Sequence, residues 1–435
     1  MMQHLISTLF IIEFLLVLFS LLQNLFNKGV NFKAGLSFAL LFFVFIPVWI
    51  MILSGVLLLS EKDFYYTTVN HVVLKSNIDT SFVLIAFIFS IIVYLYIPSK
   101  INNKKQGANI FKPSIKYYLI IYIVGMLFVF IGSGLLEGGN WYQNRHHFFK
   151  SSGAIAVLVA FIINSAKVLV ISSIVYKWIK GELNFFKFLF FVVSFAFLDM
   201  FFSGNRIYLF CTAIIIGLLL FKKYPKKTLI SFPILVPSVF VLGYFASIFR
   251  HMRGPLFAEG LPTWNIFVES LKRAMLLEPP NFTYFFIGIS ESVNVNVMYD
   301  LFRGYNDFLY GATYLKPFVF YLPRSIWENK PQSITVLAAD YLGGASLVTT
   351  VIGEMYMNFY LFGIIILPIL LWYTDVLLTN ALKSYGLMSN IVMFFFGILI
   401  FRMPFSDEFL VFVFLVIILK AFHYFKKFRF VIKSV

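Results

Sequence analysis

The segment Leu5–Phe26, LISTLFIIEFLLVLFSLLQNLF, is apolar almost without interruption and indicates a membrane protein. It runs for 22 residues, and Glu13 is its only charged residue. A helix needs about 20 mostly apolar residues to cross the hydrocarbon core of a bilayer. Because backbone groups in lipid must bond within their own segment, such a stretch forms a helix. Its lysines follow it, which favours a retained span over a cleaved signal peptide.

Ten further apolar runs bring the predicted number of membrane-spanning helices to about eleven. Hydrophobic residues make up 60% of the 435 and charged residues only 12%, which excludes a soluble domain or a disordered chain. The strands of a membrane barrel alternate, whereas these runs are apolar on every face, so we predict an all-α polytopic helix bundle. The runs are Leu5–Phe26, Gly35–Ser60, Ser81–Ile97, Tyr117–Leu136, Gly153–Tyr176, Phe188–Phe202, Ile207–Phe221, Thr228–Phe249, Val351–Tyr373, Met388–Phe401 and Phe409–Phe422.

Positive charge is divided unevenly between the two sets of connecting loops. One set, together with the C-terminal tail, holds 20 Lys and Arg residues, and the opposite short loops hold 6. The positive-inside rule therefore places the C-terminus in the cytoplasm and the N-terminus on the outer face. The net charge of +16 is then a topology signal and does not indicate a nucleic-acid partner.

The spans divide the chain into three regions. Residues 1–249 hold spans one to eight, and residues 351–435 hold spans nine to eleven with a cytoplasmic tail. Between them, residues 250–350 form one large loop on the outer face, and a loop this long is usually functional. Apolar spacing predicts one helix in this loop over Trp264–Leu277 and a second over Asn281–Phe302.

Prolines mark the part of the outer loop that follows these helices. They stand at Lys316-Pro317, Leu322-Pro323 and Lys330-Pro331. Since proline disfavours helical geometry in the residue before it, this part is predicted to be extended.

Cationic residues on the predicted outer face are candidates for a phosphate site. Arg206 and Arg402 each end an apolar run, where an unpaired charge is costly. The planar guanidinium group binds two phosphate oxygens at once and stays charged, so several arginines together suit a lipid pyrophosphate. Alternatively, each side chain simply reaches up to the lipid headgroups. The candidates are Arg145, Arg206, Arg250, Arg253, Arg324, Lys330 and Arg402.

Glu354 and His251 are the candidates for a general base that removes the proton of a sugar hydroxyl. Glu354 opens a predicted span, where an acidic group can equally stabilise the helix N-terminus. Asp199 can pair with Arg206. The remaining carboxylates at this level, for which structural roles are favoured, are Glu291, Asp300, Asp340, Asp407 and Glu408.

Two ionisable residues, Glu13 and Lys167, lie inside predicted spans. Either can mark an ion path, although a lysine there more often reaches up to the interface or pairs within the bundle, and the role of Lys167 is left open. No His, Cys and Asp spacing suits a metal site, and Gly343-Gly344 lacks the context of a phosphate-binding loop. We therefore expect no metal or other cofactor.

Short motifs resemble those of the Wzy-type polymerases, which join the oligosaccharide repeat units of bacterial surface polysaccharides. Gly204-Asn205-Arg206 resembles the Gly-(Ser/Thr/Asn)-Arg turn of that family. The loop end Leu322–Pro331 resembles its Pro-Lys/Arg-Pro stretch, and Ile352-Gly353-Glu354 resembles the opening of its next span. The family's Asn-Phe-Gly reads Asn358-Phe359-Tyr360 here, with the glycine delayed to Gly363.

Two further arginines extend the resemblance. Arg145 is similar to the arginine that follows an early outer loop in the family, and Arg402 to the one that opens its last outer turn. The enterobacterial common antigen polymerase is a distant likeness. Motif support runs mainly from Arg145 to Glu408.

The resemblance implies a fold, an activity and a location. Such enzymes have a GT-C-like fold in the bacterial inner membrane and transfer a growing glycan en bloc from undecaprenyl pyrophosphate to the next lipid-linked repeat unit. Glu354 or His251 would then be the base, and Arg206 with the other outer cations would hold pyrophosphate. A chain-length regulator and a flippase would be partners.

Two other functions remain open from the sequence. A ligase that moves finished glycan onto lipid A core would share the large outer loop and often a loop histidine, which His251 supplies. A flippase for lipid-linked oligosaccharide should place cations along a deep cavity and often shows two related halves. This sequence shows neither cations along a deep cavity nor two related halves.

Overall fold

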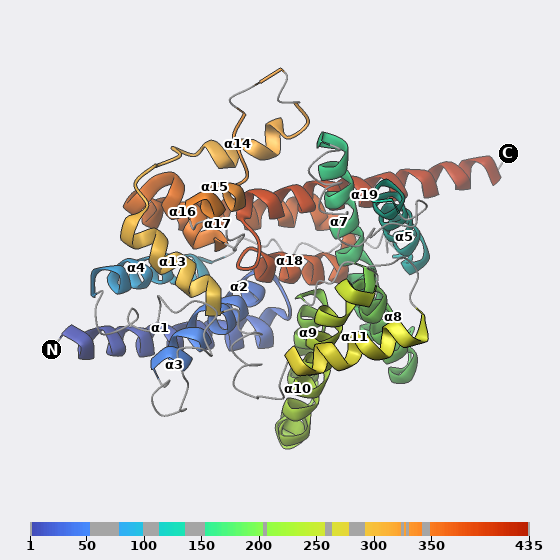
Figure 1. Cartoon of the computed structure of the whole chain (residues 1–435), viewed down its shortest axis with the longest axis horizontal. Helices are drawn as coiled ribbons and strands as arrows, with labels where there is room; N and C mark the ends of the chain where they lie inside the picture. Colours follow the sequence, from blue (N-terminus) through green and yellow to red (C-terminus); the bar gives the residue numbers. More distant parts are fainter. Residues whose placement is uncertain are drawn as a thin grey trace. The chain divides into compact units, whose positions relative to one another are not determined.

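The computed structural model of the chain describes residues 2–52, 78–98, 113–134, 153–202, 207–256, 263–277, 292–322, 326–327, 330–341 and 349–433. Every regular element in these residues is a helix, as predicted (Figure 1). The chain divides into two compact units that are interleaved in sequence. Unit 1 comprises Met1–Asn109, Phe286–Phe320 and Trp327–Leu410, and unit 2 comprises Ile110–Phe285, Tyr321–Ile326 and Val411–Val435.

Unit 1 contains the first three predicted spans, the predicted spans over Val351–Tyr373 and Met388–Phe401, and much of the outer loop. Its elements are α1 (Met2–Lys28), α2 (Phe32–Leu40), η1 (Leu41–Phe45), α3 (Ile46–Ile52), α4 (Ile78–Tyr96), α13 (Ser292–Gly304), α14 (Ala312–Val319), α15 (Ile334–Tyr341), α16 (Thr350–Phe359), η6 (Tyr360–Phe362), α17 (Gly363–Leu382), η7 (Lys383–Tyr385), α18 (Leu387–Leu399) and the start of α19 (Phe405–Lys433). The helix α2 packs against α1 on one side and α18 on another.

Glycine allows α2 and α18 to approach at backbone distance. A Cβ atom at Gly35 would lie 2.3 Å from the carbonyl oxygen of Phe394, and one at Gly397 would lie 2.5 Å from that of Phe32. Small residues have this role in membrane helix pairs, where close packing rather than water exclusion holds the helices together.

Lys33, at the start of α2, caps the end of α4. Its ammonium donates to the carbonyl oxygens of Tyr94 and Leu95 at 3.1 and 3.0 Å, and also to that of Ile97. These carbonyls end the helix and have no amide donor within it. The residue is only 4% exposed, so this cation of the predicted cytoplasmic loops is a buried helix cap.

Unit 2 holds the central predicted spans. Its helices are α5 (Ile115–Gly132), α7 (Gly153–Ile179), α8 (Phe185–Phe202), α9 (Ile207–Lys223), α10 (Pro225–Leu256), α11 (Trp264–Leu277) and the rest of α19. The Ser165 hydroxyl of α7 donates to the Val411 carbonyl at 2.7 Å, which ties α19 to this unit. The predicted helix over Trp264–Leu277 is confirmed as α11, which lies across α10 (Figure 1).

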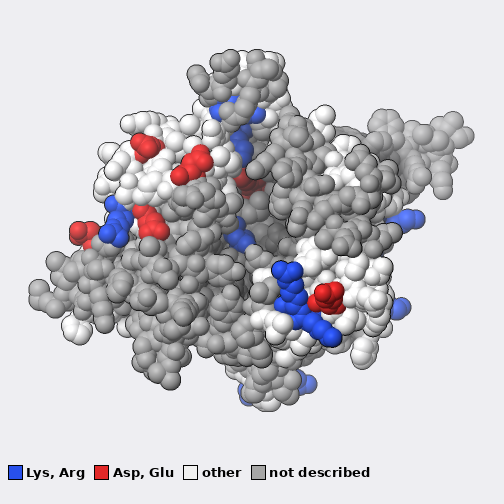
Figure 2. Space-filling model, in the orientation of Figure 1, with Lys and Arg blue, Asp and Glu red and all other residues white. Residues whose placement is uncertain are grey.

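Six helical stretches of the described residues are long and apolar enough to cross a membrane. They are His4–Lys28, Phe32–Trp49, Asp79–Tyr96, Ile115–Gly132, Ile155–Ile179 and Thr350–Tyr385. Among the described residues on the face that Figure 2 shows, charged side chains stand in separate groups between uncharged residues. The chain therefore has the features of a helical membrane protein, while eleven spans and the direction of crossing remain predictions.

The predicted span Val351–Tyr373 is interrupted near its start. Helix α16 ends at Phe359, and the short 3-10 helix η6 precedes α17. At the break, Tyr360 has φ 53° and ψ −138°, a conformation that residues other than glycine rarely adopt. Its ring lies 4.9 Å from that of Phe308 and 5.2 Å from that of Tyr356, centroid to centroid.

The outer loop contains more helix than predicted. The prediction of extended backbone at Lys316-Pro317 was wrong, because both residues lie within α14. Pro317 removes the hydrogen bond to the Thr313 carbonyl, and side-chain contacts of Thr313 and Lys316 hold the turn of α14 that precedes it. The second predicted loop helix corresponds to α13, whose predicted start at Asn281 lies outside the described residues.

Candidate functional site

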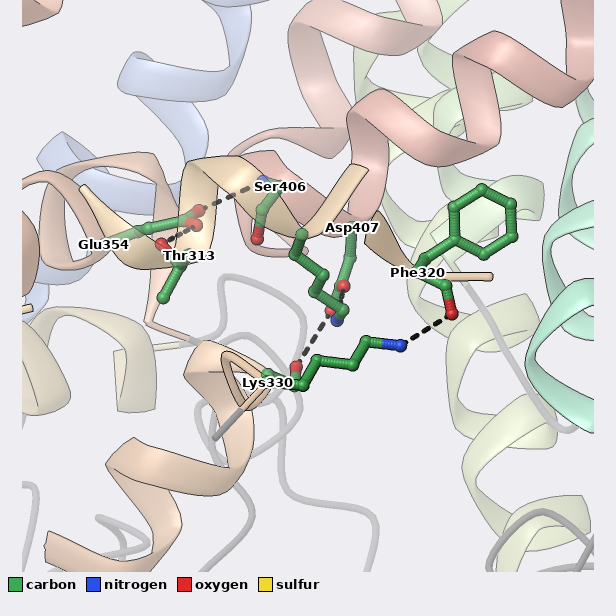
Figure 3. Close-up of polar contacts among 8 residues, drawn as sticks. Thr313, Phe320, Lys330, Glu354, Ser406 and Asp407 are labelled. Carbon is green, nitrogen blue, oxygen red and sulfur yellow. Dashed lines mark hydrogen bonds and ion pairs between the residues drawn. The ribbon is translucent and has the colours of Figure 1, made fainter. Parts of the chain in front are cut away.

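The carboxyl group of Glu354 lies at the centre of a polar cluster in unit 1 (Figure 3). It belongs to the first half of α16 and is 0% exposed. Its Oε1 atom accepts a hydrogen bond from the Thr313 hydroxyl at 2.9 Å, and its Oε2 atom accepts one from the Ser406 amide at 3.2 Å. Glu354 therefore joins α14 of the outer loop, α16 and the first turn of α19.

Asn358 holds Thr313 in place for this contact. It lies one helical turn after Glu354, and its side-chain amide donates to the Thr313 hydroxyl and to the Glu354 carbonyl, each at 2.8 Å. The Thr313 amide donates in return to Asn358 Oδ1 at 3.4 Å. Residues four apart share one face of a helix, so the two side chains of α16 meet the same residue of α14.

A second contact joins α14 to α19 one turn further along. Lys316 forms an ion pair with Asp407, and the Ser333 hydroxyl donates to the other oxygen of that carboxylate at 3.2 Å. Both charged side chains are 15% exposed, so this contact lies nearer the surface than Glu354 does. Asp407 also stands in the first turn of its helix, where a carboxylate is favourable.

Lys330, one of the predicted phosphate ligands, lies against the end of α14. Its ammonium donates to the Phe320 carbonyl at 2.7 Å (Figure 3). Phe320 is the C-cap of α14, where carbonyl groups lack a donor within the helix. This contact gives Lys330 a structural role and uses one of its three donors.

Arg402 lies in the turn between α18 and α19 and is half-buried. The turn is attached to the start of α16, because the Val351 amide donates to the Ile400 carbonyl at 2.9 Å. Arg402 stands two residues after Ile400 and four before Ser406, the partner of Glu354. Among the predicted site residues with described side chains, the structure therefore places Glu354, Arg402 and Lys330 in unit 1.

The other predicted residues belong to unit 2 or lie outside the described part. His251 is half-buried near the end of α10, and Arg250 and Arg253 stand beside it in the same helix, without described side chains. Arg145, Arg206 and Arg324 lie outside the described residues, as do Glu291 and the glycine pair at 343–344.

The remaining outer carboxylates have separate surroundings. Asp340 is exposed, and Glu408 is buried next to Asp407. Burial raises the pKa of Asp300 on α13 above its usual value, while the nearby Arg303 guanidinium lowers it. Among the described residues, no group of three or more His, Cys, Asp and Glu side chains could hold a metal ion.

A separate charged group lies inside unit 2. Lys167, in the middle of α7, is 2.7 Å from Oδ1 of Asp199 on α8, and the Tyr122 hydroxyl donates to the same oxygen at 2.9 Å. The two charged side chains are 2% and 4% exposed. Of the two alternatives that the sequence left for Lys167, the structure shows pairing within the bundle, with Asp199. The predicted pairing of Asp199 with Arg206 lies outside the described residues.

The residues that complete the Glu354 cluster were not predicted as site residues. Thr313 and Ser406 carry no signal in the sequence, because their role depends on which segments meet. Asn358 did carry one, since it follows Glu354 at helical spacing within the quoted motif.

The chain matches no protein-family model, no curated protein and no solved structure.

Proposed function

We propose that the chain is a membrane glycosyltransferase that joins lipid-linked oligosaccharide repeat units into a polysaccharide. The observation that carries the proposal is the cluster around Glu354. Two segments that resemble the Wzy-type polymerases meet there: the opening of the Glu354 span and the turn after Arg402. The described part of the third, the proline-marked loop, includes Lys330, which bonds to the Phe320 carbonyl at the end of α14. Thr313 and Ser406, which bond to Glu354, stand 41 and 52 residues from it in sequence.

In this proposal Glu354 accepts the proton of the acceptor sugar hydroxyl. A carboxylate offers about four lone-pair sites, and Thr313 and Ser406 occupy two of them. Because the carboxyl group is 0% exposed, a substrate reaches it only when α14 moves away from α16. The partly exposed pair of Lys316 and Asp407 is the outermost contact that such a movement would break.

Cationic side chains would stabilise the leaving pyrophosphate. Arg402 is half-buried in a turn that is fixed to the start of the Glu354 helix, so its charge is held at low solvent exposure. Preorganised cations in such surroundings typically contribute a hundredfold or more to the rate of a reaction that develops negative charge. Arg206 and the other predicted arginines have the same role in this proposal, within a GT-C-like fold of about eleven spans.

Deletion of the gene in its native host, followed by electrophoresis of the surface glycan, tests the proposal. If the protein is a polymerase, long chains should disappear and single repeat units on core should remain. Bare core would indicate a ligase or a flippase, and an unchanged ladder would reject all three functions.

Substitution of the proposed base sharpens the test. We expect Glu354→Gln, at wild-type abundance in the membrane, to leave single repeats, because the amide keeps the size of the side chain but accepts no proton. The matched control is Glu182→Gln, which neutralises an exposed carboxylate 3.6 Å from Lys177. A full ladder from Glu354→Gln would reject the base role.

A further inference from the structure

Glu13 is a buried carboxyl group that the proposed function does not use. It lies within the apolar stretch of α1, and only 3% of the residue is exposed. Neither carboxyl oxygen has a hydrogen-bond partner among the described residues. Phe10, three residues earlier, and Val17, four residues later, are both 0% exposed, so Glu13 lies on the face that α1 buries within unit 1.

The irregular part of the second helix packs against this face. Phe45 contacts the rings of Phe10 and Phe14 edge-on, at centroid distances of 6.4 and 5.7 Å. Phe45 ends the π-helical turn η1, and Pro47 follows two residues later. The face of α1 that carries Glu13 therefore packs beside an irregular part of the neighbouring helix.

Among the described residues, the charged groups on the helices that pack against α1 are not placed to neutralise Glu13. The helix α1 packs against α2, η1 and α4. Lys33 of α2 donates to the end of α4 and lies twelve residues before the end of η1, about 18 Å along a helix. The only charged residue of α4 is Asp79, an exposed carboxylate. On α1 itself, His4 and Lys28 lie about 14 and 22 Å along the helix.

We infer that Glu13 is an intramembrane proton-binding site, whose carboxyl group holds a proton at neutral pH. An ionised carboxylate with no cation and no donor is strongly disfavoured away from water. A bound proton removes this charge, so the neutral carboxylic acid is the favoured form at this position. Loss of the proton would place an unpaired charge between α1 and α2. The inference rests on these helices alone and is independent of the proposed function.

Infrared difference spectroscopy in lipid bilayers tests the inference directly. Between wild type and Glu13→Gln at neutral pH, we expect the carbonyl stretching band of a protonated carboxylic acid. The matched comparison of wild type with Glu182→Gln should show carboxylate bands, because that side chain is exposed and paired with Lys177. Carboxylate bands in the Glu13 difference spectrum would overturn the inference.

A chemical probe on the unmodified chain provides a second measurement. Dicyclohexylcarbodiimide dissolves in lipid and modifies protonated carboxyl groups, and peptide mass spectrometry locates the adduct. We expect an adduct on Glu13 at neutral pH that diminishes as the pH rises and is indifferent to Na⁺ or K⁺. Protection by either ion would mean that a metal cation occupies the site, and would overturn the proton assignment.

Discussion

The Thr313 hydroxyl donates to the Glu354 carboxyl at 2.9 Å, and Asn358 donates to the same hydroxyl at 2.8 Å. Thr313 is 1% exposed, and both of its partners are 0% exposed. This residue of the outer loop is thus the hydrogen-bonded link between α14 and the helix that carries Glu354. Its contacts allow the importance of the cluster to be measured without changing a charge.

Replacement of Thr313 by valine should destabilise the protein and impair its activity. Valine keeps the shape of threonine but removes the hydroxyl that donates to Glu354 Oε1 and accepts from the Asn358 amide, which keeps its bond to the Glu354 carbonyl. A buried polar group that loses its partner costs about 1–3 kcal/mol. The measurement is the thermal unfolding of purified protein in detergent, together with the glycan ladder of the complemented strain.

Thr313→Ser is the matched control, because it keeps the hydroxyl and removes only a methyl group. It should stay closer to wild type than Thr313→Val in both assays. Equal losses from the two variants would show that packing of the methyl group matters more than the hydrogen bonds.

Breaking the ion pair of Lys167 and Asp199 should lower the free energy of unfolding strongly, whereas replacing both residues should lower it much less. Lys167→Met leaves Asp199 as a buried charge with only part of its compensation, which costs about 3–5 kcal/mol. The double change Lys167→Met with Asp199→Leu should recover most of that loss, because apolar pairs of similar volume often match buried ion pairs. Thermal unfolding of the three proteins provides the comparison.

The control for this series is Lys177→Met. Lys177 pairs with Glu182 at 3.6 Å, and the two side chains are 29% and 43% exposed. An exposed pair contributes about 0–1 kcal/mol, so this variant should unfold close to wild type. A double variant at 167 and 199 no more stable than Lys167→Met would contradict the prediction.

At Tyr360, glycine should be better tolerated than alanine, the reverse of the usual order in helices. Both substitutions lose the contacts with Phe308 and Tyr356, but only glycine adopts φ 53° and ψ −138° without strain. The strain of such a conformation is on the order of 1–3 kcal/mol. The unfolding temperatures of Tyr360→Gly and Tyr360→Ala show which variant is more stable. A more stable alanine variant would refute the strained geometry.

Gly35→Ala should disrupt the contact between α2 and α18. The added Cβ would lie 2.3 Å from the Phe394 carbonyl oxygen, so the helices must separate. Overpacking of this kind costs about 1–3 kcal/mol or more. Gly217→Ala on α9 is the control, because nothing lies within 4 Å of its Cβ and alanine favours a helix by about 1 kcal/mol. Opposite shifts in unfolding temperature are expected, and equal shifts would contradict the close approach.

Several features of the fold were predictable because they depend on one segment at a time. The apolar runs predicted helices, and α11 appears with the predicted bounds Trp264–Leu277. The extended backbone expected at Lys316-Pro317 was wrong, because contacts made by Thr313 and Lys316 with distant residues stabilise α14 against the local preference of proline. Tyr360 likewise adopts a backbone conformation that its own side chain disfavours.

Candidate residues could be named from charge and position, but their partners could not. Asp199 pairs with Lys167 on another helix, a pairing that the sequence did not indicate. Lys33 looked like a loop cation and is a buried cap of α4. In each case the partner is 32 or more residues away in sequence, so spacing carried no information about it.

The amino-acid sequence by itself determined that this is a helical protein suited to a membrane, because a long apolar segment can satisfy its backbone in lipid only as a helix. The sequence also identified the charged residues within or beside apolar segments as candidates for function, because a charge is costly there unless it is paired. Only the tertiary structure decided that Glu354 meets Thr313 and Ser406 and that Glu13 meets no donor among the described residues. The physical reason is that hydrogen bonds between side chains on different helices depend on how those helices pack, and composition and periodicity do not specify that packing.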